Sequence, residues 1–160
     1  MEGKALLFKC LGGVDAVPLC VRTRSAEELI ALVQALEPSF GGVNLEDIAQ
    51  PKCFRVLDEL RATLNIPVWH DDQQGTATTV LAALENSLKV VGKRLGDVCI
   101  ALVGMGAANV ANYRLLVASG ADPQRIVACD RGGTLHANRE DLCSRQAEFP
   151  DKWRVCVESN

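Results

Sequence analysis

The chain has 160 residues, 48% of them hydrophobic, and a formal net charge of -3. This composition is enough for a folded core and excludes a wholly disordered chain. The sequence has no block of Lys and Arg that would favour nucleic acid, no apolar run long enough to span a membrane, and no secretion signal at its N-terminus. We therefore expect a cytoplasmic protein with no nucleic-acid or membrane partner.

The cysteine pattern supports the same compartment. There are seven cysteines, an odd number, and they are widely spaced without a C-x-x-C pair. Several stand inside apolar runs, as Cys99 does. The pattern predicts reduced, buried thiols rather than a disulfide framework or a zinc site.

Two short apolar runs open the chain, Ala5–Phe8 and Val17–Val21, and we interpret both as strands separated by a glycine turn. Lys4 precedes the first run, and its surroundings alone indicate a solvated surface residue. Ser25 then begins a helix with a capping-box sequence, and Pro38 ends it.

Two acidic pairs follow the next two predicted strands. Glu46-Asp47 comes after the run Phe40–Leu45, and Asp71-Asp72 comes after the run that begins at Ile66, with a helix from Pro51 between them. Carboxylates at the ends of neighbouring strands can converge, and Mg²⁺ takes oxygen ligands of this kind. The alternative is that acids simply cap strand and helix ends. His70 stands just before the second pair, where a structural, hydrogen-bonded role is the commoner one.

A strand-turn-helix-strand unit follows a helix predicted to be buried over Thr76–Val91. The run Val98–Val103 is typical of a parallel strand buried on both faces, and Arg125–Asp130 predicts a second such strand. Between them, Gly104–Ala108 forms a turn that would offer backbone N–H groups to the pyrophosphate of a dinucleotide. Asp130 stands where a carboxylate can hydrogen-bond the adenosine ribose.

One residue departs from the usual dinucleotide pattern. Asn109 occupies the position of a third glycine or alanine, so we expect a wider separation of helix and strand or an altered loop. The tail, Asn138–Asn160, predicts one or two short helices, with Trp153 and Val157 as packing residues.

Five segments together resemble the malic enzymes, specifically the short bacterial malate dehydrogenases that decarboxylate oxaloacetate. The matching segments are Met1–Lys9, Gly13–Pro18, Phe40–Ile48, Asn65–Ala77 and Gly104–Ala108. They run in family order and are joined by the strand that ends at Asp130.

The resemblance implies a role for each matching site residue. Glu46, Asp47 and Asp72 would ligate Mg²⁺ or Mn²⁺. Lys4 matches the catalytic lysine of the family, and Asp71 would lie beside the metal as a second catalytic group. The implied NAD or NADP site consists of Gly104, Met105, Gly106, Ala107, Ala108 and Asp130.

The implied fold is α/β, with residues 1–73 as part of a substrate and metal lobe and residues 74–160 as the first half of a Rossmann-like NAD(P)-binding domain. The implied reaction is the oxidative decarboxylation of L-malate to pyruvate and CO₂, carried out by a homodimer. The tyrosine acid and the downstream nicotinamide contacts of the family have no counterpart in this sequence. We therefore expect a fragment with weak or no turnover. A malolactic-type lyase and a non-catalytic metal-binding or assembly module are the alternatives.

Overall fold

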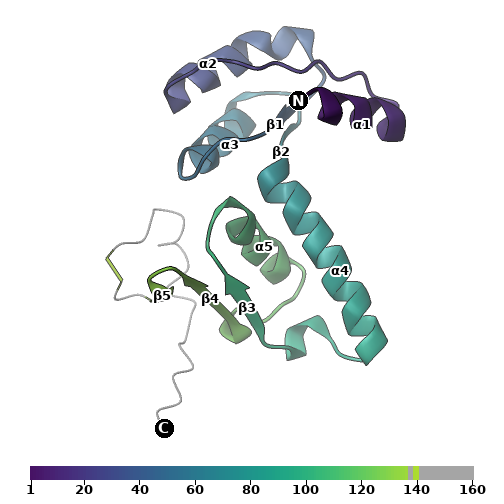
Figure 1. Ribbon diagram of the computed structural model, residues 1–160, viewed down its shortest axis with the longest axis vertical. Coiled ribbons are helices and arrows are strands. Elements are labelled where there is room, and N and C mark those ends of the chain that lie inside the picture. The colour runs from purple at the N-terminus through teal and green to yellow at the C-terminus, as the bar shows by residue number, and fades with distance from the viewer. Residues whose placement is uncertain (137–138, 141–160) are drawn as a thin grey trace.

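The computed structural model describes residues 1–136, 139 and 140. Figure 1 shows two groups of elements along the long axis of the molecule, one with strands β1 and β2 and the other with strands β3–β5. The helices predicted for the tail fall outside the described residues.

The first group is a two-stranded parallel sheet with two helices. Strand β1 (Val43–Leu45) pairs with β2 (Val68–His70), so that Leu45 lies opposite His70. Helices α2 (Ala26–Leu36) and α3 (Lys52–Thr63) supply most of its core. The buried residues of this first core are Ala26, Leu29, Ile30, Val33, Leu45, Val56, Leu57, Leu60 and Val68.

Local sequence explains where these helices begin and end. The Ser25 hydroxyl accepts a hydrogen bond of 3.1 Å from the Glu28 backbone N–H, as the capping-box sequence predicts. The 3₁₀ turn Glu37–Ser39 contains Pro38 and closes α2. Pro51 stands at the N-cap of α3, where its missing N–H costs no helical hydrogen bond.

The second group contains the predicted strand-turn-helix-strand unit. Strand β3 (Ile100–Val103) runs parallel to β4 (Ile126–Asp130), and β5 (Gly133–Thr134) pairs antiparallel with β4. Helix α5 (Ala107–Ala118) connects β3 to β4 and packs on α4 (Thr76–Val91). Short 3₁₀ turns cover Leu95–Asp97 and Pro123–Arg125, and a π-helical turn, η2, covers Asp71–Gly75.

The second core draws on both groups of elements. Its buried residues are Cys53, Phe54, Leu102, Met105, Val110, Tyr113, Leu116, Ala121, Ile126, Ala128 and Leu135. Cys53 and Phe54 lie on α3, so this helix links the two cores. The expected α/β class and the first part of a Rossmann-like unit are therefore confirmed.

The two strands expected near the N-terminus are wrong. Residues Glu2–Gly12 form helix α1, which Gly13 ends in the left-handed conformation at φ 67°. Val17–Val21 has no regular structure. A lone strand leaves its backbone N–H and C=O groups without hydrogen-bond partners, whereas a helix pairs most of them internally. The apolar run has no neighbouring strand to pair with, and it therefore forms a helix.

Three expectations about burial also need correction. In α4, Ala77 and Leu88 are buried, but Val91 is 61% exposed. Val103 on β3 is 77% exposed, because side chains alternate along the strand and the described residues leave the face with Ala101 and Val103 uncovered. Cys53 is buried as expected, whereas Cys10, Cys20 and Cys99 are exposed.

No helix in the described part of the chain combines the length and the hydrophobicity that crossing a bilayer requires.

We predict that the first core carries much of the stability of its group of elements. Leu60 is fully buried, so Leu60→Ala should lower the free energy of unfolding by about 2–5 kcal/mol through lost burial and a residual cavity. Val90→Ala, at a position 87% exposed on α4, should change it by less than about 0.5 kcal/mol. Urea denaturation followed by circular dichroism compares them, and equal losses in the two variants would contradict the assignment.

Candidate active site

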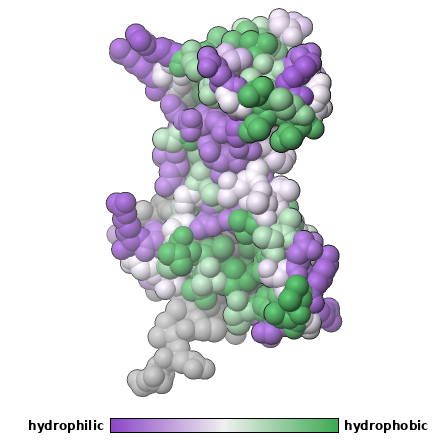
Figure 2. All heavy atoms as spheres, turned by 45° about the vertical axis from the view of Figure 1, so that its right-hand side comes forward, coloured by the Kyte–Doolittle hydropathy of each residue, from purple (hydrophilic) through white to green (hydrophobic). Residues whose placement is uncertain are grey.

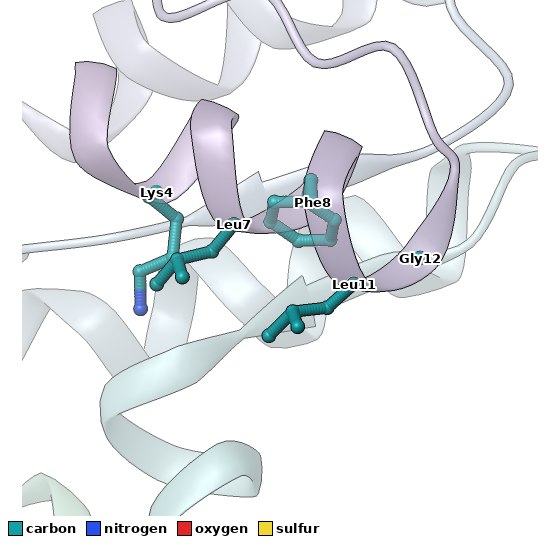
Figure 3. A pocket seen from close by; sticks show the side chains of 5 residues that line it. All are labelled: Lys4, Leu7, Phe8, Leu11 and Gly12. Carbon is teal, nitrogen blue, oxygen red and sulfur yellow. The ribbon is translucent and has the colours of Figure 1, made fainter.

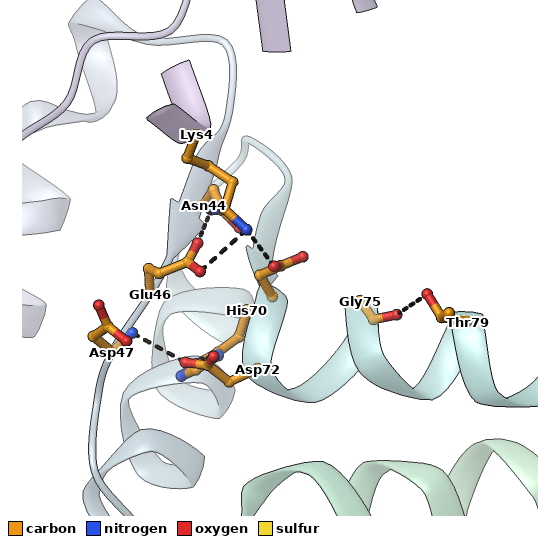
Figure 4. A network of polar contacts seen from close by, with 9 residues as sticks. Lys4, Asn44, Glu46, Asp47, His70, Asp72, Gly75 and Thr79 are labelled. Carbon is orange, nitrogen blue, oxygen red and sulfur yellow. Dashed lines mark hydrogen bonds and ion pairs between the residues drawn. The ribbon is translucent and has the colours of Figure 1, made fainter. Parts of the chain in front are cut away.

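The parallel pairing of β1 and β2 brings both acidic pairs to one edge of the small sheet. Glu46 and Asp47 follow β1, and Asp71 and Asp72 open the π-helical turn that follows β2. The Asp47 backbone N–H donates a 3.0 Å hydrogen bond to Asp72 Oδ2, which joins the two chain segments (Figure 4). The convergence expected from the sequence is present in the chain path.

Lys4 reaches this edge from helix α1. Its Nζ lies 3.1 Å from Glu46 Oε1 and 2.5 Å from Asp71 Oδ2. The Glu46 carboxylate also accepts a 3.0 Å hydrogen bond from Asn44 Nδ2 (Figure 4). Lys4 therefore belongs to the carboxylate cluster. Its neighbours in the sequence indicate a solvated surface residue and do not predict these contacts.

The contacts of Lys4 shift the pKa of both partners. The hydrogen bonds to Asp71 and then Glu46 raise the pKa of Lys4, and the hydrogen bond from Lys4 lowers the pKa of Asp71. Both side chains are therefore charged at neutral pH. A lysine that accepts a proton needs the opposite shift, so the contacts present here oppose the role of base.

His70 lies beneath the carboxylates and is fully buried. Burial lowers its pKa, so the ring is neutral near pH 7. Its Nδ1 lies 3.9 Å from Asp72 Oδ2, and neither ring nitrogen has a hydrogen-bond partner among the described residues. The hydrogen-bonded structural role expected for this histidine does not describe it: the ring packs against the site without such a bond.

The predicted metal ligands share this edge without closing on one point. Among the residues that the structure describes, no three His, Cys, Asp or Glu side chains are placed to hold a metal ion. The chemistry of Glu46, Asp47 and Asp72 nevertheless fits a hard cation, since all three offer carboxylate oxygens. Their role as ligands stays a prediction.

An open hollow of about 340 Å³ lies beside Lys4. One face of α1 lines it, with Lys4, Leu7, Phe8 and Leu11 at helical spacing and Gly12 at its end (Figure 3). The hollow places an apolar surface next to the charged cluster.

The glycine turn between β3 and α5 has the expected backbone features. Gly104 adopts φ 85°, and Gly106 is the N-cap of α5 without a side-chain capping hydrogen bond. The first N–H groups of the helix thus face the turn, as a phosphate site requires. Met105 is 2% exposed and packs in the second core, so its side chain points away from any ligand of the turn.

Asn109 braces this turn. Its Nδ2 donates to the carbonyl oxygens of Val103 at 3.0 Å and Gly104 at 2.7 Å. Its Oδ1 accepts a 2.8 Å hydrogen bond from Asn112. The expected alteration of the loop is therefore a polar link from helix to strand end.

Asp130 is engaged by an arginine that the sequence did not single out. Arg139 Nη1 and Nη2 lie 2.7 and 3.2 Å from its two carboxylate oxygens, and the Gly132 backbone N–H adds a bond of 2.8 Å. Any ribose hydroxyl would share this carboxylate with Arg139. No local sequence pattern indicates the ion pair of Asp130 and Arg139, because the two residues are nine positions apart.

We predict that Lys4 controls the titration of Asp71. Lys4→Met removes the hydrogen bond and charge that lower the Asp71 pKa, so this pKa should rise toward its ordinary value near about 3.9. Carbon-13 NMR of the Asp71 carboxyl measures the shift. Lys9→Met, which removes the partner of Asp15 instead, should leave the Asp71 pKa unchanged.

The sign of the linked stability follows from the directions of the shifts. The lowered Asp71 pKa stabilises the fold above about pH 4, and this contribution is lost as pH falls through the folded value. The raised Lys4 pKa stabilises it below about pH 10, and this contribution is lost as pH rises through the folded value. A stability difference between wild type and Lys4→Met that persists unchanged at pH 2 would contradict the pairing.

Comparison with known proteins connects this site to one family. Residues 22–61 match the malic enzyme N-terminal domain. The chain is 50% identical over 136 residues to an NAD-dependent malic enzyme of Geobacillus stearothermophilus, covering 85% of this chain and 28% of the relative. It is 43% identical over 158 residues to a bifunctional malic/malolactic enzyme of Bacillus subtilis, covering 96% of this chain and 38% of the relative.

The fold agrees with the sequence comparison. The crystal structure of Entamoeba histolytica malic enzyme matches with a TM-score of 0.92 and 44% identity, over 96% of this chain and 34% of that one. The chain thus spans between about a quarter and two fifths of the length of these relatives. Over the part that it spans, the chain is similar to malic enzymes in both sequence and fold.

Proposed function

We propose that the chain carries the proton-transfer and metal-binding part of a site for the oxidative decarboxylation of L-malate to pyruvate and CO₂ with NAD or NADP. The observation that carries the proposal is the meeting of Lys4 with Glu46 and Asp71 at the edge that also holds Asp72. The names of the relatives support it, since they include NAD-dependent and NADP-dependent malic enzymes.

Glu46, Asp47 and Asp72 would hold Mg²⁺ or Mn²⁺, with their carboxylates turned toward one point. When bound, the cation would supply Lewis-acid polarisation of the oxygen on C2 and of the adjacent carboxylate. Lys4 would take the C2 hydroxyl proton as hydride leaves for the nicotinamide, and later return a proton to the three-carbon product.

Asp71 is the natural positioning partner of the Lys4 side chain. Lys4 must lose a proton before it can accept one, and two carboxylates now hold its pKa high. Glu46 cannot both pair with Lys4 and turn fully toward a cation, so its withdrawal would lower the Lys4 pKa. Asp71, at 2.5 Å, would then fix the position of the Lys4 amine.

The remaining part of the chain would bind the dinucleotide. Gly104, Gly106, Ala107 and Ala108 would present backbone N–H groups to the phosphates, with Met105 contributing only its backbone. Asp130 would share its carboxylate between the ribose and Arg139. We propose that residues 1–73 belong to the substrate and metal lobe and residues 74–160 to the nucleotide lobe, with the boundary inside the π-helical turn.

A malolactic-type lyase is the second candidate, because one relative carries both names. Analysis of the product separates the two activities, since the lyase yields lactate and the oxidative reaction yields pyruvate. We place the reaction in the cytoplasm, in keeping with the reduced thiols of Cys10, Cys20, Cys99 and Cys129 in the described part of the chain.

The first test is calorimetric titration of the protein with Mn²⁺, with and without L-malate. We expect binding in the wild type and its loss in Asp72→Asn, which replaces a charged oxygen ligand with an amide. Asp97→Asn is the matched control, because Asp97 lies in a 3₁₀ turn of the other group of elements. Equal Mn²⁺ binding by all three proteins would contradict the proposed ligand set.

We also propose a homodimer in which a second copy covers α1. The helix has no buried residue, and Leu6, Leu7 and Leu11 are 62%, 53% and 83% exposed. Figure 2 shows hydrophobic residues on the upper part of the molecule, above a polar band, and a further group of them below that band. Exposed apolar surface of this kind marks an interaction site.

Leu11→Glu should weaken the dimer, because it places a charge in the apolar face. Sedimentation equilibrium measures the association, and Val90→Glu, at an exposed site on α4, is the control. A wild-type protein that stays monomeric at high concentration would overturn the dimer.

A further inference from the structure

Gly75 stands out among the glycines because of what lies over it. Its backbone is ordinary right-handed helix, at φ -61° and ψ -49°, so the conformation itself does not demand glycine. A Cβ placed at Gly75 would lie 2.2 Å from Asp71 Oδ1 and 2.9 Å from Asp71 Cγ. The three nearest atoms to that position all belong to Asp71.

The π-helical turn produces this arrangement. Asp71 and Gly75 are the first and last residues of the turn, and Asp71 folds its carboxyl group over the bare Cα of Gly75. From there its other oxygen, Oδ2, reaches Lys4 Nζ at 2.5 Å. The Gly75 carbonyl accepts a 3.1 Å hydrogen bond from the Thr79 hydroxyl, which ties the turn to α4 (Figure 4).

A methyl group at this position forces the Asp71 carboxyl group to move, because the new Cβ would collide with Oδ1 and lie 2.9 Å from Cγ. Rotation about the Cβ–Cγ bond moves the oxygens but not Cγ, so the carboxyl group must also turn about the Cα–Cβ bond. That movement shifts Oδ2 from its position against Lys4.

We propose that Gly75 is a positioning residue: its missing side chain is the space that holds the Asp71 carboxyl group against Lys4. The inference rests on the proposed function, in which Lys4 is the proton carrier and Asp71 fixes its amine. It adds a residue that touches neither substrate nor metal and acts only through Asp71.

The test compares Gly75→Ala with Gly3→Ala. Gly3 lies on α1, one residue from Lys4, and a Cβ there meets nothing within 4 Å. Proton NMR of the labelled protein records the cross-peaks between Lys4 Hε and Asp71 Hβ. We expect these cross-peaks in the wild type and Gly3→Ala, and their loss in Gly75→Ala. Their survival in Gly75→Ala, or their loss in Gly3→Ala, would overturn the inference.

A second measurement applies even if Gly75→Ala folds poorly. In an Asp71→Ala background the collision is gone, so Gly75→Ala should raise the midpoint of thermal unfolding by about 1–4 °C through better helix propensity. In the wild-type background, Gly75→Ala should raise the midpoint of thermal unfolding by less than this, because the new methyl group collides with Asp71. An equal effect in both backgrounds would show that Asp71 is not the group displaced.

These readouts are independent of turnover and of Mn²⁺. Loss of the Lys4–Asp71 contact in a protein that binds no Mn²⁺ would support the role of Gly75 and contradict the proposed function. Retention of the contact in Gly75→Ala, in a protein that binds Mn²⁺ through Asp72, would contradict the role of Gly75 and support the proposed function.

Discussion

The parallel register of β1 and β2 is the constraint on which the candidate site depends. Parallel neighbours end at the same edge of a sheet, so the chain must place Glu46-Asp47 beside Asp71-Asp72. Four carboxylates at one edge repel one another unless a cation lies among them. Lys4 supplies that cation from a distant part of the sequence, at 3.1 Å from Glu46 and 2.5 Å from Asp71.

The sequence predicted elements well where the cause is local. Ser25, Pro38 and Pro51 begin or end helices through their own backbone or capping chemistry, which neighbouring residues do not change. The N-terminal run was misread because strand and helix differ there only by the presence of a pairing partner. Strand β3 is less buried than its apolar sequence predicts, because the described residues cover only one face of its sheet.

In the candidate site, too, the sequence predicted the features with a local cause and missed those that depend on the fold. Both acidic pairs and the glycine turn were visible in the sequence, because their motifs are contiguous. Three contacts could not be read from it: Asn44 with Glu46, Arg139 with Asp130, and Asp71 over Gly75. Each depends on a side-chain direction that only the folded backbone sets. The roles of Lys4 and the metal ligands came from family resemblance, since spacing alone left them open.

Helix α1 brings the decisive charge to the site and yet has no buried residue of its own. Residues 13–24 then connect it to α2 without helix or strand. An element anchored so lightly opens locally at low free energy, independently of the cores. When α1 lifts, the carboxylates lose their counter-charge while the two cores remain folded. A partner that covered the apolar face of α1 would therefore also set how long the charge cluster stays assembled, and its binding would be thermodynamically linked to the electrostatics of the candidate site.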